Sequence, residues 1–150
     1  MLVINMNENN ELLEYIYQNA SIGVKSLTDL INIINGKDNK IKKIVEGELK
    51  GYENFVKDSK KLLKKYKVKP KEKSMMANIF SKVSMNLELM KDNSDARIAD
   101  MLIKGFTMGN VDIEKIIDRY EDDARDDILK LAKNLLKFGE ENINLLKPYL

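Results

Sequence analysis

Carboxylates are the side chains of this chain with the most scope for chemistry. The sequence contains no His and no Cys, which removes the usual general base near neutral pH, thiolate nucleophiles and the commonest metal ligands. Any catalysis or metal binding must therefore use Asp, Glu, Lys, Ser or Tyr. The densest group of acids is Glu121, Asp122, Asp123, Asp126 and Asp127. Such oxygen ligands suit divalent cations, but acids at the start of a helix also complement its dipole, and we favour this second role.

Two further acids lie where apolar residues are expected. Glu48 and Asp112 fall on the predicted inner seams of two helices, where a charge is costly and often functional. If these helices run parallel, the two acids lie ten residues apart in height, or about 15 Å. A pair of metal ions needs a separation of about 4 Å, so Glu48 and Asp112 cannot share one metal site.

Other polar residues lie on the predicted seams at the same two heights along the bundle as Glu48 and Asp112. Ser26 and Asn142 share the height of Glu48, and Ser59 shares the height of Asp112. Buried polar groups of this kind fix the register of helices, or lie at the edge of a seam and extend their polar atoms to solvent. The sequence therefore favours a structural polar seam, made of these five residues, over a metal site.

Three glycines, Gly23, Gly105 and Gly109, fall inside predicted helices on the seam side. Each costs about 1 kcal/mol of helix stability relative to Ala, so a gain in packing should offset that cost. We expect close packing against a neighbouring helix or an aromatic side chain at these positions. A ligand pocket in the interior is the alternative.

The elements that position these residues are helices, because apolar residues recur at helical spacing and no strand-like alternation occurs. The pattern predicts four helices, over about 8–35, 38–66, 95–120 and 123–149. Gly36 should end the first helix, and Asp38 should cap the second. With 150 residues, of which 43% are hydrophobic, the chain is expected to form one all-α domain, a four-helix bundle that spans residues 1–150.

A long connection separates the second and third predicted helices. Residues 67–94 are far too many for a turn between neighbouring bundle helices. Within them, the segment 74–90 carries a Met-rich apolar stripe made of Met76, Ile79, Phe80, Val83, Leu87 and Met90. We expect a short crossover helix that packs on the bundle, although such a segment can also dock a protein partner or a membrane surface.

The two halves of the chain are similar to each other. Residues 55–66 (FVKDSKKLLKKY) and 138–149 (FGEENINLLKPY) share Phe, Leu-Leu-Lys and Tyr at matching positions, 83 residues apart. The match predicts two pseudo-repeated helical hairpins, one over about 8–66 and one over about 95–149, with the crossover 67–94 between them.

This arrangement resembles the ferritin-like superfamily over the whole chain. The resemblance rests on the repeated Phe-x6-Leu-Leu-Lys-x-Tyr segments, on the paired Gly23 and Gly109, and on the crossover 67–94. It implies a ferritin-like four-helix bundle, similar to small members that have no assigned activity. In the di-metal members, two helices each provide Glu and two each provide Glu-x-x-His. Here the residues three after Glu46, Glu48, Glu53, Glu140 and Glu141 are Leu49, Gly51, Val56, Ile143 and Asn144. No set of metal ligands carries over.

The net charge is only +2, but it is spread unevenly. Residues 57–73 carry nine Lys against two acids, and residues 112–127 carry eight acids against three basic residues. If the second and third helices run parallel, these tracts meet at one end of the bundle and neutralise each other. A basic tract can bind phosphate, but this one has no Arg, no glycine loop and only Tyr66 as an aromatic residue. A solvated helix end is therefore favoured over nucleic-acid binding.

The remaining expectations concern location and function. No run approaches the roughly 20 apolar residues of a membrane span, and the start of the chain lacks the basic residues of a signal peptide, so we expect a cytoplasmic protein without a membrane span. The missing residue types favour a binding, scaffolding or stress-related structural protein over an enzyme. We expect no cofactor. The sequence leaves open whether the protein forms a homo-oligomer. The alternatives are a divalent-metal protein that uses carboxylates alone and a carrier of a small apolar ligand.

Overall fold

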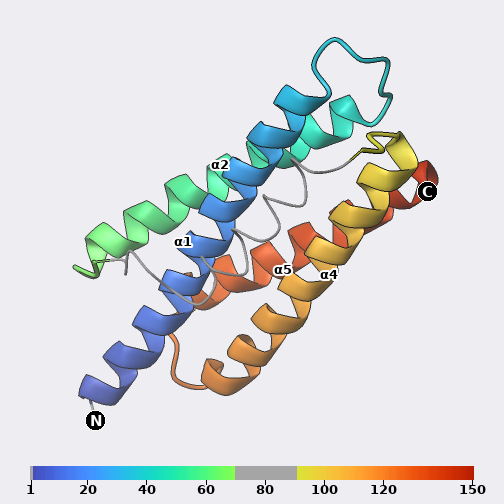
Figure 1. Cartoon of the computed structure of the whole chain (residues 1–150). Helices are drawn as coiled ribbons and strands as arrows, with labels where there is room; N and C mark the ends of the chain where they lie inside the picture. The colour runs from blue at the N-terminus through green and yellow to red at the C-terminus, as the bar shows by residue number, and fades with distance from the viewer. Residues whose placement is uncertain (1, 70–90) are drawn as a thin grey trace.

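The computed structural model describes residues 2–69 and 91–150, with side chains from residue 9 onward. This part of the chain is all-helical and contains no strand (Figure 1). The helices are α1 (Leu2–Ile33), α2 (Lys42–Lys65), α4 (Asp95–Tyr120) and α5 (Asp126–Leu146), followed by the short 3-10 helix η1 (Lys147–Tyr149). The predicted crossover helix over 74–90 lies outside the described residues. None of the described helices has the length and apolar character that a membrane span requires.

The start of α2 corrects the prediction for its cap. Asp38 does not cap this helix, which begins at Lys42 with Ile41 at the N-cap and no side-chain cap. Instead, the carboxylate of Asp95, in the first turn of α4, accepts hydrogen bonds from the backbone N–H groups of Lys40 (3.0 Å) and Ile41 (3.4 Å). A residue distant in sequence thus satisfies donors at the start of α2 that have no intrahelical partner.

The other helix ends follow local rules more closely. α1 ends at Ile33, and Gly36 lies in the turn that follows, at φ +75°, a backbone conformation that glycine adopts readily. α4 has the predicted bounds, and the hydroxyl of Ser94 caps it by accepting from the N–H of Arg97 (3.3 Å). α5 begins at Asp126 instead of residue 123, because residues 121–124 form the turn after α4.

The helices pack as two hairpins. α1 pairs with α2, α4 pairs with α5, α2 also packs against α5, and α1 also packs against α4 and α5. Within the described residues, the backbones of α2 and α4 do not come close to each other, so these helices lie on a diagonal of the bundle. They begin at the same end, where the Asn39 side-chain amide donates to the Asn93 carbonyl oxygen (2.8 Å), and they run parallel (Figure 1).

The core has two parts along the bundle axis. One part lies towards the start of α1 and includes Leu12, Leu13, Ile16, Ile113, Ile117, Ile128 and Leu135. The other lies towards the turn between α1 and α2 and includes Leu27, Leu30, Ile34, Ile41, Val45, Ile98 and Leu146. Tyr52 and Phe138 pack against both parts. The middle of the bundle is therefore an aromatic layer between two mainly aliphatic parts of the core.

Candidate functional site

The middle layer of the bundle is built from aromatic rings on three helices. Tyr52 of α2 stacks on Phe106 of α4, with ring centroids 5.9 Å apart. Phe138 of α5 meets Tyr52 edge-on at 5.0 Å and Phe55 at 5.3 Å. Such offset-stacked and edge-to-face pairs add about 0.5–1.5 kcal/mol beyond the burial of their area. The layer ties α2, α4 and α5 together at one height.

Each of the four helices contributes a glycine near this layer, and a side chain from a neighbouring helix lies over it. Tyr52 of α2 covers Gly23 of α1, and Phe138 of α5 covers Gly51 of α2. Asn110 of α4 covers Gly139 of α5, and Asn19 of α1 approaches Gly109 of α4. The contacts thus form a closed cycle around the bundle, in which every helix gives one side chain and receives one.

The strength of these contacts differs around the cycle. A methyl group added at Gly23, Gly51 or Gly139 would collide with the side chain that covers it, whereas one at Gly109 would meet the Asn19 amide nitrogen at 3.5 Å, an ordinary contact. Close approach therefore offsets the helix cost of three glycines. Gly51 and Gly139 were not predicted because they lie off the heptad seam, although each adjoins an aromatic residue in sequence.

Two predictions for α4 are wrong. Gly105 is exposed with open space where a side chain would start, and Asp112 is exposed as well. The buried positions are instead one residue further along, at Phe106 and Ile113. One residue turns the direction of a side chain by about 100° around a helix, so a small error in register moved both residues from the interior to the surface.

Glu48 is the most unusual residue of the interior. Its side chain is only 1% exposed, and neither carboxylate oxygen has a hydrogen-bond partner. Desolvation by burial raises the pKa of Glu48 to about 8, so the neutral carboxyl group is the favoured form at pH 7. Burial, followed by the nearby charges of Glu48 and Tyr15, also raises the pKa of Tyr52. Burial thus favours the protonated form of an acid in the interior.

The five residues of the predicted polar seam do not form one network. The hydroxyl of Ser59 donates to the Val56 carbonyl oxygen (3.1 Å), and the side-chain amide of Asn142 donates to the Phe138 carbonyl oxygen (2.8 Å), in each case within the residue's own helix. Ser26 is only partly buried. Buried serine and asparagine can satisfy themselves on a preceding carbonyl of their own helix, whereas Glu48 has no such bond.

A small cavity adjoins the aromatic layer. Its volume accessible to water is about 20 Å³, which is room for one water molecule. The lining includes Asn19, Tyr52, Phe106, Gly109, Asn110 and Gly139. The side chains of Asn19 and Asn110 give it polar character, and the hydroxyl of Tyr15 donates to the Gly109 carbonyl oxygen nearby (3.3 Å). This cavity is too small for the apolar ligand that the sequence left as an alternative.

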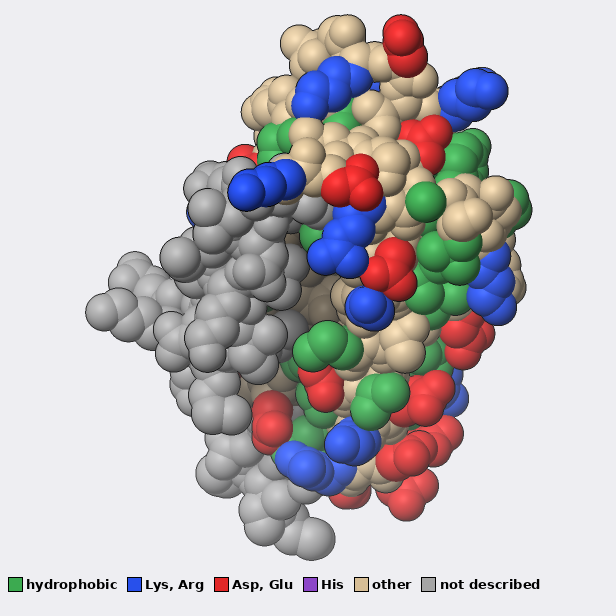
Figure 2. Space-filling model, turned by 45° about the vertical axis from the view of Figure 1, so that its right-hand side comes forward, with side chains coloured by type: hydrophobic (Ala, Val, Ile, Leu, Met, Phe, Trp, Pro, Cys, Tyr) green, Lys and Arg blue, Asp and Glu red, His purple; other side chains and the backbone are tan. Residues whose placement is uncertain are grey.

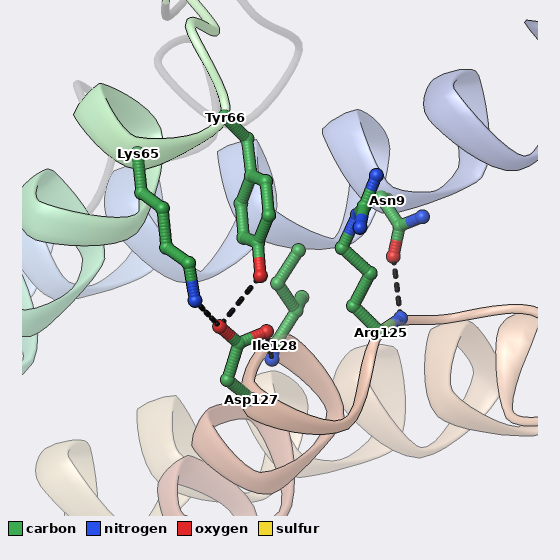
Figure 3. A network of polar contacts seen from close by, with 6 residues as sticks. All are labelled: Asn9, Lys65, Tyr66, Arg125, Asp127 and Ile128. Carbon is green, nitrogen blue, oxygen red and sulfur yellow. Dashed lines mark hydrogen bonds and ion pairs between the residues drawn. The ribbon is translucent and has the colours of Figure 1, made fainter.

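The acidic side chains at residues 121–127 bind different partners and do not gather at one place. Asp127 accepts hydrogen bonds from the Tyr66 hydroxyl (2.6 Å) and the Lys65 ammonium (3.0 Å) (Figure 3). Glu121 pairs with Lys133 instead (3.3 Å). Among the described residues, which include all five acids, no three acidic side chains come together as a group that could hold a metal ion. The alternative cation site on Glu121, Asp122, Asp123, Asp126 and Asp127 therefore has no basis in this geometry.

The contacts of Asp127 instead fasten one end of the bundle. Burial acts to raise the pKa of this carboxyl, but the hydrogen bonds from Tyr66 and Lys65 outweigh it and leave the pKa lowered. The guanidinium of Arg125 lies 4.6 Å from the centre of the Tyr66 ring, and the backbone N–H of Arg125 donates to Asn9 of α1 (2.7 Å). Figure 3 shows how these residues join α2, α5 and α1. The basic and acidic tracts thus meet at this end, as their sequence positions predict for a parallel α2 and α4.

Comparisons with known proteins find no family model, no curated protein and no solved structure that matches this chain. The arguments for its function therefore come from its own residues.

Proposed function

We propose that this chain is a ferritin-like four-helix bundle without a redox metal site, and that it acts as a binding, scaffolding or stress-related structural protein. The proposal includes two related hairpins joined by a crossover through residues 67–94. It is supported by the parallel, diagonal placement of α2 and α4, because the chain leaves α2 at one end of the bundle and enters α4 at the other. A crossover is the connection that joins two such ends in ferritin-like bundles.

The observation that carries the non-catalytic role is the isolation of Glu48. A redox di-metal centre of the ferritin-like pattern uses several inward carboxylates and two imidazoles. In the described part of the chain, Glu48 is the one buried acidic side chain, and the sequence has no His. A single buried carboxyl provides too few ligands for two metal ions.

An iron-loading experiment tests this proposal. Protein incubated with ferrous iron without oxygen and then aerated should oxidise iron no faster than a buffer blank. Glu48→Gln should leave the metal content unchanged, and so should Glu46→Gln, a matched control at an exposed position of the same helix. Stoichiometric iron that is lost in Glu48→Gln but kept in Glu46→Gln would overturn the proposal in favour of a carboxylate-only metal site.

A further inference from the structure

A groove that is open to solvent on one side runs between α1 and α2. Its volume is about 550 Å³, which lies in the range of small-ligand sites. Three residues of α1 and four of α2 line it: Tyr17, Ser21, Val24, Glu53, Val56, Lys57 and Lys60. The small interior cavity beside Tyr52 shares none of these residues, so the groove is a separate site.

Short side chains leave the groove open and give it an apolar floor. Ser21 folds back on its own helix, where its hydroxyl donates to the Tyr17 carbonyl oxygen (2.8 Å). The hydroxyl is therefore already satisfied and does not fill the space between the helices. The residues whose side chains are only partly buried, and whose apolar atoms form the floor, are Tyr17, Val24 and Val56.

The rim of the groove on α2 carries charges of opposite sign at its two ends. Glu53, Lys57 and Lys60 are all exposed, and none of them makes an ion pair within the described residues. The two lysines lie four and seven residues beyond Glu53, or about 6 and 10 Å along the helix. One end of the groove is therefore positive and the other is negative.

The residues of α1 can be placed at the same two ends. Tyr52 of α2 lies over Gly23 of α1, so these residues share a height in the antiparallel hairpin (Figure 1). Val24 follows Gly23 directly and lies at the negative end. Tyr17 precedes Gly23 by six residues and lies at the positive end, beside the two lysines.

The surface on the side of α4 is of a different kind. Figure 2 brings this side forward and shows hydrophobic side chains interspersed with acidic and basic ones. Met108 and Val111 of α4 are exposed, but single apolar side chains among charges are normal on a protein surface. In the groove, by contrast, apolar atoms lie behind a charged rim. A concave floor of this kind suits a slender ligand better than the flat face of a protein partner.

We propose that the groove between α1 and α2 binds a medium-chain fatty acid. Its carboxylate lies between Lys57 and Lys60, and its hydrocarbon chain follows the floor towards Val24. The lysines attract the carboxylate and Glu53 repels it from the opposite end, so the charges select one orientation. Tyr17 and Val24 are seven residues apart, about 10 Å, which suits a chain such as that of decanoate. This inference goes beyond the proposed function and uses none of the interior residues.

The affinity should be modest. Burial of the hydrocarbon chain should provide most of it, because ion pairs to exposed lysines are weak. Since one side of the groove is open, the expected Kd for decanoate is about 0.1–1 mM. Added salt should weaken the binding, because it screens the exposed lysines.

Isothermal titration calorimetry with monomeric decanoate tests the role of the charges. A protein with both Lys57→Gln and Lys60→Gln should bind decanoate about threefold to tenfold more weakly than wild type. The matched control carries Lys43→Gln and Lys61→Gln, at exposed positions of the same helix that do not line the groove, and should bind like wild type. Acetate, which lacks the chain, and decylamine, which carries the opposite charge, should show no measurable binding.

A steric variant tests the position of the hydrocarbon chain. Ser21→Leu places a large side chain in the groove and should abolish binding of decanoate. Asn32→Leu, at an exposed position further along α1, is the matched control and should leave the affinity unchanged. Circular dichroism checks that each variant is folded.

Two kinds of result would overturn the proposal. Decanoate binding that is equal in wild type and in the variant without Lys57 and Lys60, or that survives Ser21→Leu, would be adsorption elsewhere on the protein. Binding to phosphatidylglycerol vesicles without binding of monomeric decanoate would assign this surface to a membrane instead.

Discussion

The ring of Phe138 in α5 lies directly over Gly51 in α2, at a place where any side chain on residue 51 would collide with it. Gly47, one turn earlier in the same helix, has open space around it. The two glycines lie in the same helix but differ in what packs over them. Substitutions at both positions therefore separate the effect of packing on stability from the effect of helix propensity.

Gly51→Ala should destabilise the protein by about 1–3 kcal/mol, because overpacking outweighs the better helix propensity of Ala. Gly47→Ala should instead stabilise it by about 0.5–1 kcal/mol, because only propensity changes there. Urea unfolding monitored by circular dichroism measures both. Equal effects of the two substitutions would show that Phe138 does not occupy the space over Gly51.

Glu48 predicts a dependence of stability on pH. Burial raises the pKa of Glu48 from 4.5 in the unfolded chain to about 8 in the folded protein. The folded state therefore binds more protons between these values, and the contribution of Glu48 to the free energy of unfolding falls as pH rises from about 4.5 to about 8. The slope is about 1.4 kcal/mol per pH unit within that window.

Glu48→Gln should remove this slope, because glutamine keeps the shape of the protonated acid without its ionisation. The variant should be more stable than wild type near pH 8 and closer to it near pH 4.5. Unfolding curves across this range compare wild type, Glu48→Gln and the exposed control Glu46→Gln. A slope that is the same in all three proteins would place the source of the pH dependence elsewhere.

Tyr66 and Lys65 both bind Asp127, but we expect their substitution to change the stability of the protein by different amounts. Tyr66→Phe removes a partly buried hydrogen bond to a carboxylate and should destabilise the protein by about 1–2 kcal/mol. Lys65→Met removes an exposed ion pair to the same acid and should change stability little. Denaturant midpoints measure both. A larger loss for Lys65→Met than for Tyr66→Phe would contradict this ranking.

The parallel course of α2 and α4 can be tested by crosslinking. A zero-length reagent that joins lysine to carboxylate should link Lys65 to Asp127 within one chain, because their charged atoms are 3.0 Å apart. In a bundle with helices alternating up and down, the two residues would lie at opposite ends, about 39 Å apart for a helix of 26 residues. Mass spectrometry of the digested monomer locates the link, and links found only between chains would refute the arrangement.

The existence and type of the helices followed from sequence alone. Apolar residues at helical spacing predicted all four described helices, and α4 has its predicted bounds. The burial of Glu48 was predicted from its place in the apolar pattern, and the meeting of the basic and acidic tracts from the parallel helices that the long connection at 67–94 implies. These features depend on the local pattern of residues or on the length of a connection, both of which the sequence shows directly.

The tertiary structure decided the rotation and the detailed contacts of each helix. The predicted seam of α4 started at Ile98 and continued by heptads to Gly105 and Asp112, whereas the buried residues at those heights are Phe106 and Ile113. Which of two adjacent residues faces inward depends on the side chains that meet it from other helices. For the same reason, the cap of α2 by Asp95, the rings over Gly23 and Gly51, and the separation of the acids at 121–127 appear only when the helices are packed together.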